Sequence, residues 1–126
     1  MSTIGHPHND YVLVHQIVED AICAALKAAI PGEIAKNVDK AAREAIEKEG
    51  FGKYFVHRTG HGLGTEIHEA PFITSSSETI LEPGMVFSIE PGIYMPGKFG
   101  VRLEEIVILH DCLLYTSDAA DDTRSV

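Results

Sequence analysis

Three histidines in one glycine-rich stretch, HRTGHGLGTEIHEAP, are the residues of this sequence best suited to chemistry. His57, His61 and His68 are spaced by four and seven residues, and glycines flank His61 on both sides. Glycine lets a ligand or another backbone approach that imidazole closely. A neutral imidazole is a good ligand for Zn, Mn, Co or Fe. A single histidine is more often structural, but three histidines with interleaved glycines favour a functional site.

Two glutamates downstream add carboxylates to this set. Glu90 ends an apolar stretch and is followed at once by a Pro-Gly turn, so its side chain is expected to project from the end of a strand. Glu104 lies two residues beyond Arg102 on one strand face, where a guanidinium can orient a carboxylate. A surface ion pair is the alternative for Arg102 and Glu104. One imidazole and two carboxylates on separate strands suit a hard or borderline divalent cation.

Two helices are predicted before these segments. Apolar residues recur at three- and four-residue steps over residues 11–30, which is typical of an amphipathic helix. Residues 1–10 are expected to form a loop that ends in a helix cap at Asp10, and Pro31-Gly32 is expected to stop the helix. A second helix is predicted over about residues 33–49, with Gly50 suited to its C-terminal cap.

Strands are predicted after the helices. The short apolar stretches 85–89 and 101–109 have strand character, so the sequence favours an α+β fold. Residues 101–109 are predicted to be one strand that crosses a core, with Arg102, Glu104, Ile106 and Ile108 on one face. Residues 113–126 have no periodic apolar face and are predicted to be a disordered or non-native tail, which leaves residues 1–112 as the domain.

Composition narrows the classes of function. The 126 residues are 44% hydrophobic, which suits one domain or a fragment of one. The formal net charge is −9, and no basic cluster is present, so nucleic acid is not expected as a partner. No apolar run is long enough to cross a bilayer and the N-terminus has no signal-like segment, so we expect a cytoplasmic protein without a membrane partner. The two cysteines lack CxxC spacing and are expected to be incidental or buried thiols.

The motifs GHGLG with a downstream IHEAP, LEPGMVFSIEPGIY and GVRLEE resemble those of the pita-bread metallopeptidases. This family includes methionine aminopeptidase, Xaa-Pro aminopeptidase, prolidase and the metal-free enzyme creatinase. The resemblance covers residues 11–109 and implies part of a pita-bread fold, in which two helices precede a curved antiparallel sheet. It also implies two divalent metal ions, Mn, Co or Zn, in the full-length enzyme, and a possible homodimer of that enzyme.

The resemblance assigns roles to individual residues. His61, Glu90 and Glu104 match the family's metal ligands, and Glu90 also matches its general base. His68 matches the histidine that stabilises the tetrahedral intermediate. His57 matches a second pocket histidine, and Arg102 a residue that fixes the ligands. The wording IEPGIY and GVRLEE is closer to Xaa-Pro aminopeptidases and dipeptidases, which implies a peptide substrate with proline after the scissile bond.

One departure from the family pattern is important. The family supplies two further aspartate ligands just before the first helix, and Asp10 and Asp20 do not substitute for them. We therefore expect a peptidase gene whose present fragment has little activity alone. The alternatives are a non-catalytic module that binds peptides or proteins, a creatinase-like hydrolase without metal, and purely structural histidines and glutamates.

Overall fold

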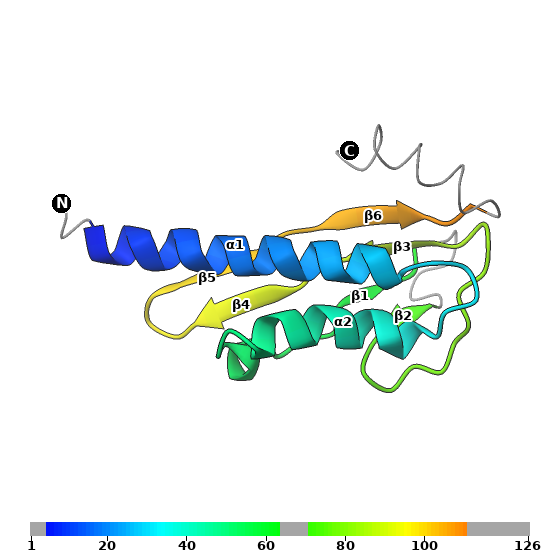
Figure 1. Cartoon of the computed structure of the whole chain (residues 1–126), viewed down its shortest axis with the longest axis horizontal. Helices are drawn as coiled ribbons and strands as arrows, with labels where there is room; N and C mark the ends of the chain where they lie inside the picture. The colour runs from blue at the N-terminus through cyan, green and yellow to red at the C-terminus, as the bar shows by residue number, and fades with distance from the viewer. Residues whose placement is uncertain (1–4, 64–70, 111–126) are drawn as a thin grey trace.

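Two helices pack against short antiparallel strands (Figure 1). The structure is a computed structural model, and it describes residues 5–63 and 71–110. In chain order the elements are α1 (Gly5–Ala28), α2 (Ala35–Glu47), a 3-10 turn (Gly52–Tyr54), β1 (Gly60–His61), β2 (Phe72–Ile73), β3 (Val86–Ile89), β4 (Gly92–Met95), β5 (Phe99–Arg102) and β6 (Glu105–Ile108). Helix α1 packs against α2 and contacts β3, β4 and β5, whereas α2 contacts β2. The predicted α+β order of helices followed by strands is confirmed.

Helix α1 begins earlier than its apolar pattern predicts. It starts at Gly5, so the loop predicted for residues 5–10 and the cap predicted at Asp10 are wrong. Proline is tolerated in a first helical turn because the N–H groups there have no acceptor within the helix. Pro7 therefore does not interrupt α1. The helix ends at Ala28, shortly before Gly32 turns the chain with a φ of 95°.

The predicted apolar faces of both helices form the core. Burial of each Val or Ile side chain contributes about 1.5–3 kcal/mol to folding. The strands add large buried side chains to the same cluster, among them Phe87, Ile89 and Ile93. The buried apolar residues of the helices are Val14, Ile17, Val18, Ala21, Ile22 and Ala25 of α1, and Ala35, Val38, Ala42 and Ile46 of α2.

The ends of α2 are fixed by neighbouring residues. Its N-cap residue, Ile34, provides no capping side chain. The carboxylate of Glu33 accepts hydrogen bonds instead, from the Ile34 N–H at 3.0 Å and from the Asn37 side-chain amide at 2.6 Å. At the other end, Gly50 takes a φ of 90° and its N–H donates to the Glu47 carbonyl at 2.9 Å. The helix itself ends at Glu47 with Lys48 as its C-cap, so the predicted helix runs two residues too far and Gly50 lies just beyond the cap.

The strands form three antiparallel pairs. They are β1 with β2, β3 with β6, and β4 with β5. An antiparallel bridge between Gly62 and Phe87 joins the first pair to the second, and the Leu63 N–H donates to the Val86 carbonyl at 2.8 Å. These contacts bring β1, which carries a candidate ligand, against β3.

The single strand predicted over residues 101–109 is wrong, because β5 and β6 are separate strands with different partners. The break between β3 and β4 at Glu90 and Pro91 lies opposite the break between β5 and β6. The Leu103 N–H donates to the Pro91 carbonyl at 3.4 Å across this break. The predicted alternation nevertheless holds, since Arg102, Glu104, Ile106 and Ile108 are exposed while Leu109 is buried.

No helix within the described part of the chain is long and apolar enough to cross a membrane. Cys23 lies exposed on α1 as a free thiol.

Candidate metal site

Close approach of β1 to β3 forms the base of the candidate site. A Cβ atom at position 60 would collide with the carbonyl oxygen of Ser88, so only glycine allows this backbone contact. The N–H of His61 then donates to Ser88 Oγ at 3.1 Å. The glycine beside the central histidine therefore has a packing reason that the sequence motif alone does not reveal.

His61 and Glu90 face each other across this contact. Nε2 of His61 lies 3.2 Å from Oε2 of Glu90. On its other side, Nδ1 lies 3.0 Å from the Gly62 carbonyl oxygen. A carbonyl can only accept, so Nδ1 carries the hydrogen and Nε2 of the neutral ring presents a lone pair to the carboxylate.

This donor set fits a cation. Two atoms that both carry lone pairs stay at 3.2 Å only when a proton or a metal ion is shared between them. Imidazole nitrogen with carboxylate oxygen is a combination that Zn, Mn and Co accept. The His61 side chain is 34% exposed and that of Glu90 is 16% exposed, so an ion can reach both groups from solvent.

The Glu90 carboxylate is held by two further side chains. Ser88 Oγ donates to Oε2 at 2.7 Å, and Arg102 Nη1 lies 3.9 Å from Oε1. The sequence suggests that Arg102 orients Glu104, but in the described structure Arg102 forms an ion pair with Glu90. Arg102 is half exposed, so this pair orients the carboxylate more than it stabilises the fold.

The third predicted ligand, Glu104, is placed differently. Glu104 is exposed in the link between β5 and β6. Within residues 5–63 and 71–110, no group of three or more His, Cys, Asp or Glu side chains lies close enough together to hold a metal ion. The structure therefore brings together His61 and Glu90 and leaves Glu104 apart from them. His68 lies outside the described residues.

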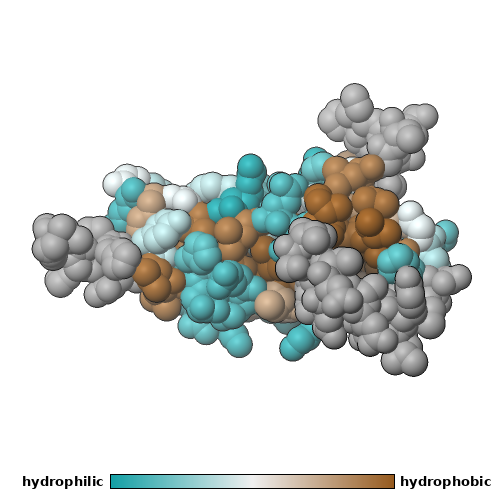
Figure 2. Space-filling model, turned by 90° about the horizontal axis from the view of Figure 1, so that it is seen from above, coloured by the Kyte–Doolittle hydropathy of each residue, from teal (hydrophilic) through white to brown (hydrophobic). Residues whose placement is uncertain are grey.

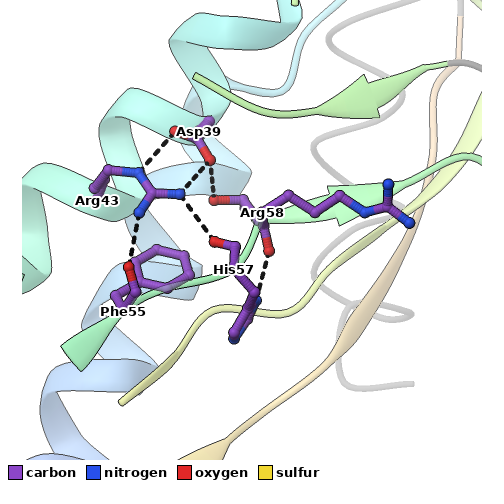
Figure 3. A network of polar contacts seen from close by, with 6 residues as sticks. Asp39, Arg43, Phe55, His57 and Arg58 are labelled. Carbon is purple, nitrogen blue, oxygen red and sulfur yellow. Dashed lines mark hydrogen bonds and ion pairs between the residues drawn. The ribbon is translucent and has the colours of Figure 1, made fainter. Parts of the chain in front are cut away.

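His57 is a half-buried residue beside the site. Its ring packs edge-on to Phe55 at 5.0 Å and to Tyr94 at 5.5 Å between centroids. Nδ1 lies 2.7 Å from the Arg58 carbonyl oxygen (Figure 3), so Nδ1 is the donor of the ring. Nε2 is buried and has no hydrogen-bond partner in the described structure. A buried polar atom without a partner is unusual in a folded protein and marks this nitrogen as a candidate for contact with a ligand.

Sequence reasoning missed the polar residues that support the site, namely Ser88, Thr59, Asp39 and Arg43. Asp39 and Arg43 are four residues apart on a helix, a spacing typical of surface ion pairs. Nothing in the sequence distinguishes them from such a pair, because their burial depends on how α2 packs.

The chain matches known metallopeptidases along most of its length. The Metallopeptidase family M24 model matches residues 1–111. The chain is 48% identical over 107 residues to the probable dipeptidase PepE of Mycobacterium tuberculosis, covering 85% of this chain and 28% of that protein. It is 47% identical over 106 residues to the Xaa-Pro dipeptidase of Pyrococcus furiosus, covering 84% of this chain and 30% of that protein.

A solved structure shows the same fold. The prolidase of Thermococcus sibiricus superimposes with a TM-score of 0.79 at 50% identity, covering 82% of this chain and 28% of that one. The expected partial pita-bread fold is thereby confirmed. The chain spans less than a third of the length of these relatives. With a family model that covers nearly all of its residues, the chain belongs to metallopeptidase family M24.

Proposed function

We propose a function in the metal-dependent hydrolysis of peptide bonds that have proline after the scissile bond. The proposal is carried by the 3.2 Å approach of His61 Nε2 to Glu90 Oε2 in a chain that belongs to a metallopeptidase family. The names of two relatives, both Xaa-Pro dipeptidases, support the preference for proline. The substrate class is then an Xaa-Pro dipeptide or a peptide that begins with this sequence.

The ligands assigned to two divalent ions, Mn, Co or Zn, are His61, Glu90 and Glu104. When bound, such ions supply a water of lowered pKa and positive charge beside the scissile carbonyl. His61 contributes Nε2, and Glu90 contributes a carboxylate that Ser88 and Arg102 keep in place. Glu104, which the described structure leaves apart from these two residues, is assigned a second carboxylate on the family resemblance alone.

Protons are moved by Glu90 and the pocket histidines. Glu90 accepts a proton from the attacking water as general base. His68 donates a hydrogen bond to the oxygen of the tetrahedral intermediate. His57 contacts the substrate through Nε2, and the burial of this nitrogen without a partner in the described structure supports that role.

The 126-residue chain alone is proposed to bind metal weakly and to have little activity. The family resemblance calls for two aspartate ligands, but Asp10 and Asp20 are exposed on α1 rather than placed on a strand beside His61. Two carboxylates fewer leave less negative charge to offset a pair of divalent cations. The cytoplasmic location and the homodimer of a longer form stay predictions.

The test compares this chain with a chimera in which it replaces the matching segment of the Pyrococcus furiosus Xaa-Pro dipeptidase. We expect the chimera to bind Mn²⁺ in titration calorimetry and to hydrolyse alanyl-proline, and the chain alone to do neither well. His61→Ala should abolish both properties, whereas His15→Ala on the outer side of α1 should leave them unchanged.

Three outcomes contradict parts of this proposal. A folded chimera that binds the peptide, but does not bind metal and does not hydrolyse the peptide, indicates a binding module. Turnover that survives exhaustive chelation indicates a creatinase-like hydrolase. Tight metal binding and turnover by the 126-residue chain alone refute its proposed dependence on further ligands.

A further inference from the structure

A buried carboxylate on α2 lies beneath the segment that carries His57. Asp39 is 0% exposed, and its two oxygens accept hydrogen bonds from Nε and Nη2 of Arg43, each at 3.0 Å. The Arg43 side chain is itself 24% exposed. This bidentate geometry fixes the guanidinium plane one turn further along the helix (Figure 3).

Arg43 uses its remaining N–H groups to hold the backbone next to the site. Nη1 donates to the Phe55 carbonyl and Nη2 to the His57 carbonyl, both at 3.0 Å. Its guanidinium also lies 4.1 Å from the centroid of the Phe55 ring. That ring in turn packs against the imidazole of His57. The position of the imidazole therefore depends on Arg43 through both backbone and ring contacts.

Thr59 extends the same network to Glu90. Its hydroxyl donates to Asp39 Oδ1 at 2.6 Å, and its carbonyl accepts from the Glu90 N–H at 2.6 Å. Thr59 is fully buried. One carboxylate on α2 is thus connected by short polar contacts to the backbone of both His57 and Glu90.

We infer that Asp39, Arg43 and Thr59, together called the α2 clamp, are positioning residues for the proposed metal and substrate site. This inference rests on the proposed function. A buried ion pair is a poor source of net stability, because the cost of desolvation offsets much of its attraction. Here Arg43 instead donates hydrogen bonds to the backbone carbonyls of Phe55 and His57, and so holds the segment that carries His57. Lysine cannot replace Arg43 in this role, since it lacks the planar fork of donors.

The test uses substitutions that keep size and charge. Arg43→Lys keeps the charge beside Asp39 but loses the bonds to the Phe55 and His57 carbonyls. Thr59→Val removes only the hydroxyl, and Thr59→Ser restores it. Val18→Ala is the matched control, since it opens a cavity on α1 without removing any hydrogen bond of the clamp. Two variants at different residues keep the test valid if Arg43→Lys does not fold.

Two NMR measurements on the 126-residue chain report positioning directly. We expect Arg43→Lys and Thr59→Val to shift the imidazole cross-peak of His57 by more than its linewidth. We expect the Glu90 amide to exchange roughly tenfold faster relative to the core amides of α1. Thr59→Ser and Val18→Ala should leave both readouts near their original values.

A third measurement links the clamp to the metal. In the chimera, Arg43→Lys and Thr59→Val should weaken Mn²⁺ binding about 10- to 100-fold, as loss of residues that orient ligands does elsewhere. Folded clamp variants with an unchanged His57 signal and Glu90 exchange, or equal changes in Val18→Ala, overturn the inference. An unmodified chimera that binds no Mn²⁺ refutes the proposed function instead, and the NMR result then stands separately.

Discussion

Ser88 connects the two candidate ligands atom by atom. Its buried Oγ accepts the His61 N–H at 3.1 Å and donates to Glu90 Oε2 at 2.7 Å. A hydroxyl can accept one hydrogen bond while donating another, which few other small side chains can do. One residue thereby fixes both the backbone of the histidine and the carboxylate of the glutamate.

Ser88→Ala is expected to lower the free energy of unfolding by about 1–3 kcal/mol, because it leaves a buried N–H and a carboxylate oxygen without this partner. Chemical denaturation followed by circular dichroism measures the loss. Ser76→Ala, in an exposed loop, is the control and should change stability little. Equal stabilities of the two variants would show that the Ser88 hydroxyl is not needed to hold the site together.

At the scale of elements, α2 depends on a residue outside its own N-cap position. Glu33 accepts hydrogen bonds from Asn37 and from the Ile34 N–H. These two bonds, that from the Asn37 side chain first, hold the pKa of the Glu33 carboxyl below its ordinary value. The first turn of α2 therefore gains stability from the ionised carboxylate.

The pH dependence of this contribution has a defined sign. Because the pKa of Glu33 is lower in the folded state, its stabilisation is complete above the ordinary pKa of a glutamate and is lost as the pH falls through the folded value. Glu33→Gln should remove this part of the acid sensitivity. Unfolding measured from neutral to acidic pH checks it, with Glu49→Gln in the exposed turn after α2 as control. Identical slopes for wild type and Glu33→Gln would contradict this assignment.

The sequence predicts the helices, the strand character and the candidate ligands better than it predicts the polar residues that hold those ligands in place. The periodic apolar residues of α1 and α2 and the alternation around Ile106 are local patterns, so the sequence alone reveals them. The break between β5 and β6 lies opposite the break between β3 and β4 at Pro91, and the alternating pattern of residues 101–109 does not record it. The roles of Ser88 and Asp39 depend on which segments meet in space, and no local pattern records that.

At the scale of the whole molecule, apolar surface is concentrated over the end that carries β6 (Figure 2). Ile106 and Ile108 are 44% and 56% exposed on this strand. Among the described strands, β6 pairs with β3 alone, so it lies at the edge of that strand pair. Exposed apolar edge strands favour association between chains.

We expect the 126-residue chain to self-associate with increasing concentration, and Ile108→Lys to reduce this association. Sedimentation velocity over a series of concentrations measures the effect. Ser76→Lys, which also adds one positive charge but lies in an exposed loop away from β6, controls for the change in net charge. A monodisperse monomer at all concentrations would argue against self-association through β6.

The approach of β1 to β3 has a thermodynamic consequence. His61 belongs to one strand pair and Glu90 follows a strand of another, so an ion bound by both side chains cross-links them. An ion that binds the folded chain but not the unfolded one stabilises it by mass action, about 2.7 kcal/mol at a hundredfold excess over Kd. The midpoint of thermal unfolding of the chimera should therefore rise with Mn²⁺ concentration and lose that rise in His61→Ala. An unfolding midpoint that does not depend on Mn²⁺ would show that metal binding and folding are independent. A midpoint that rises with Mn²⁺ means that occupancy of the site and stability of the fold change together.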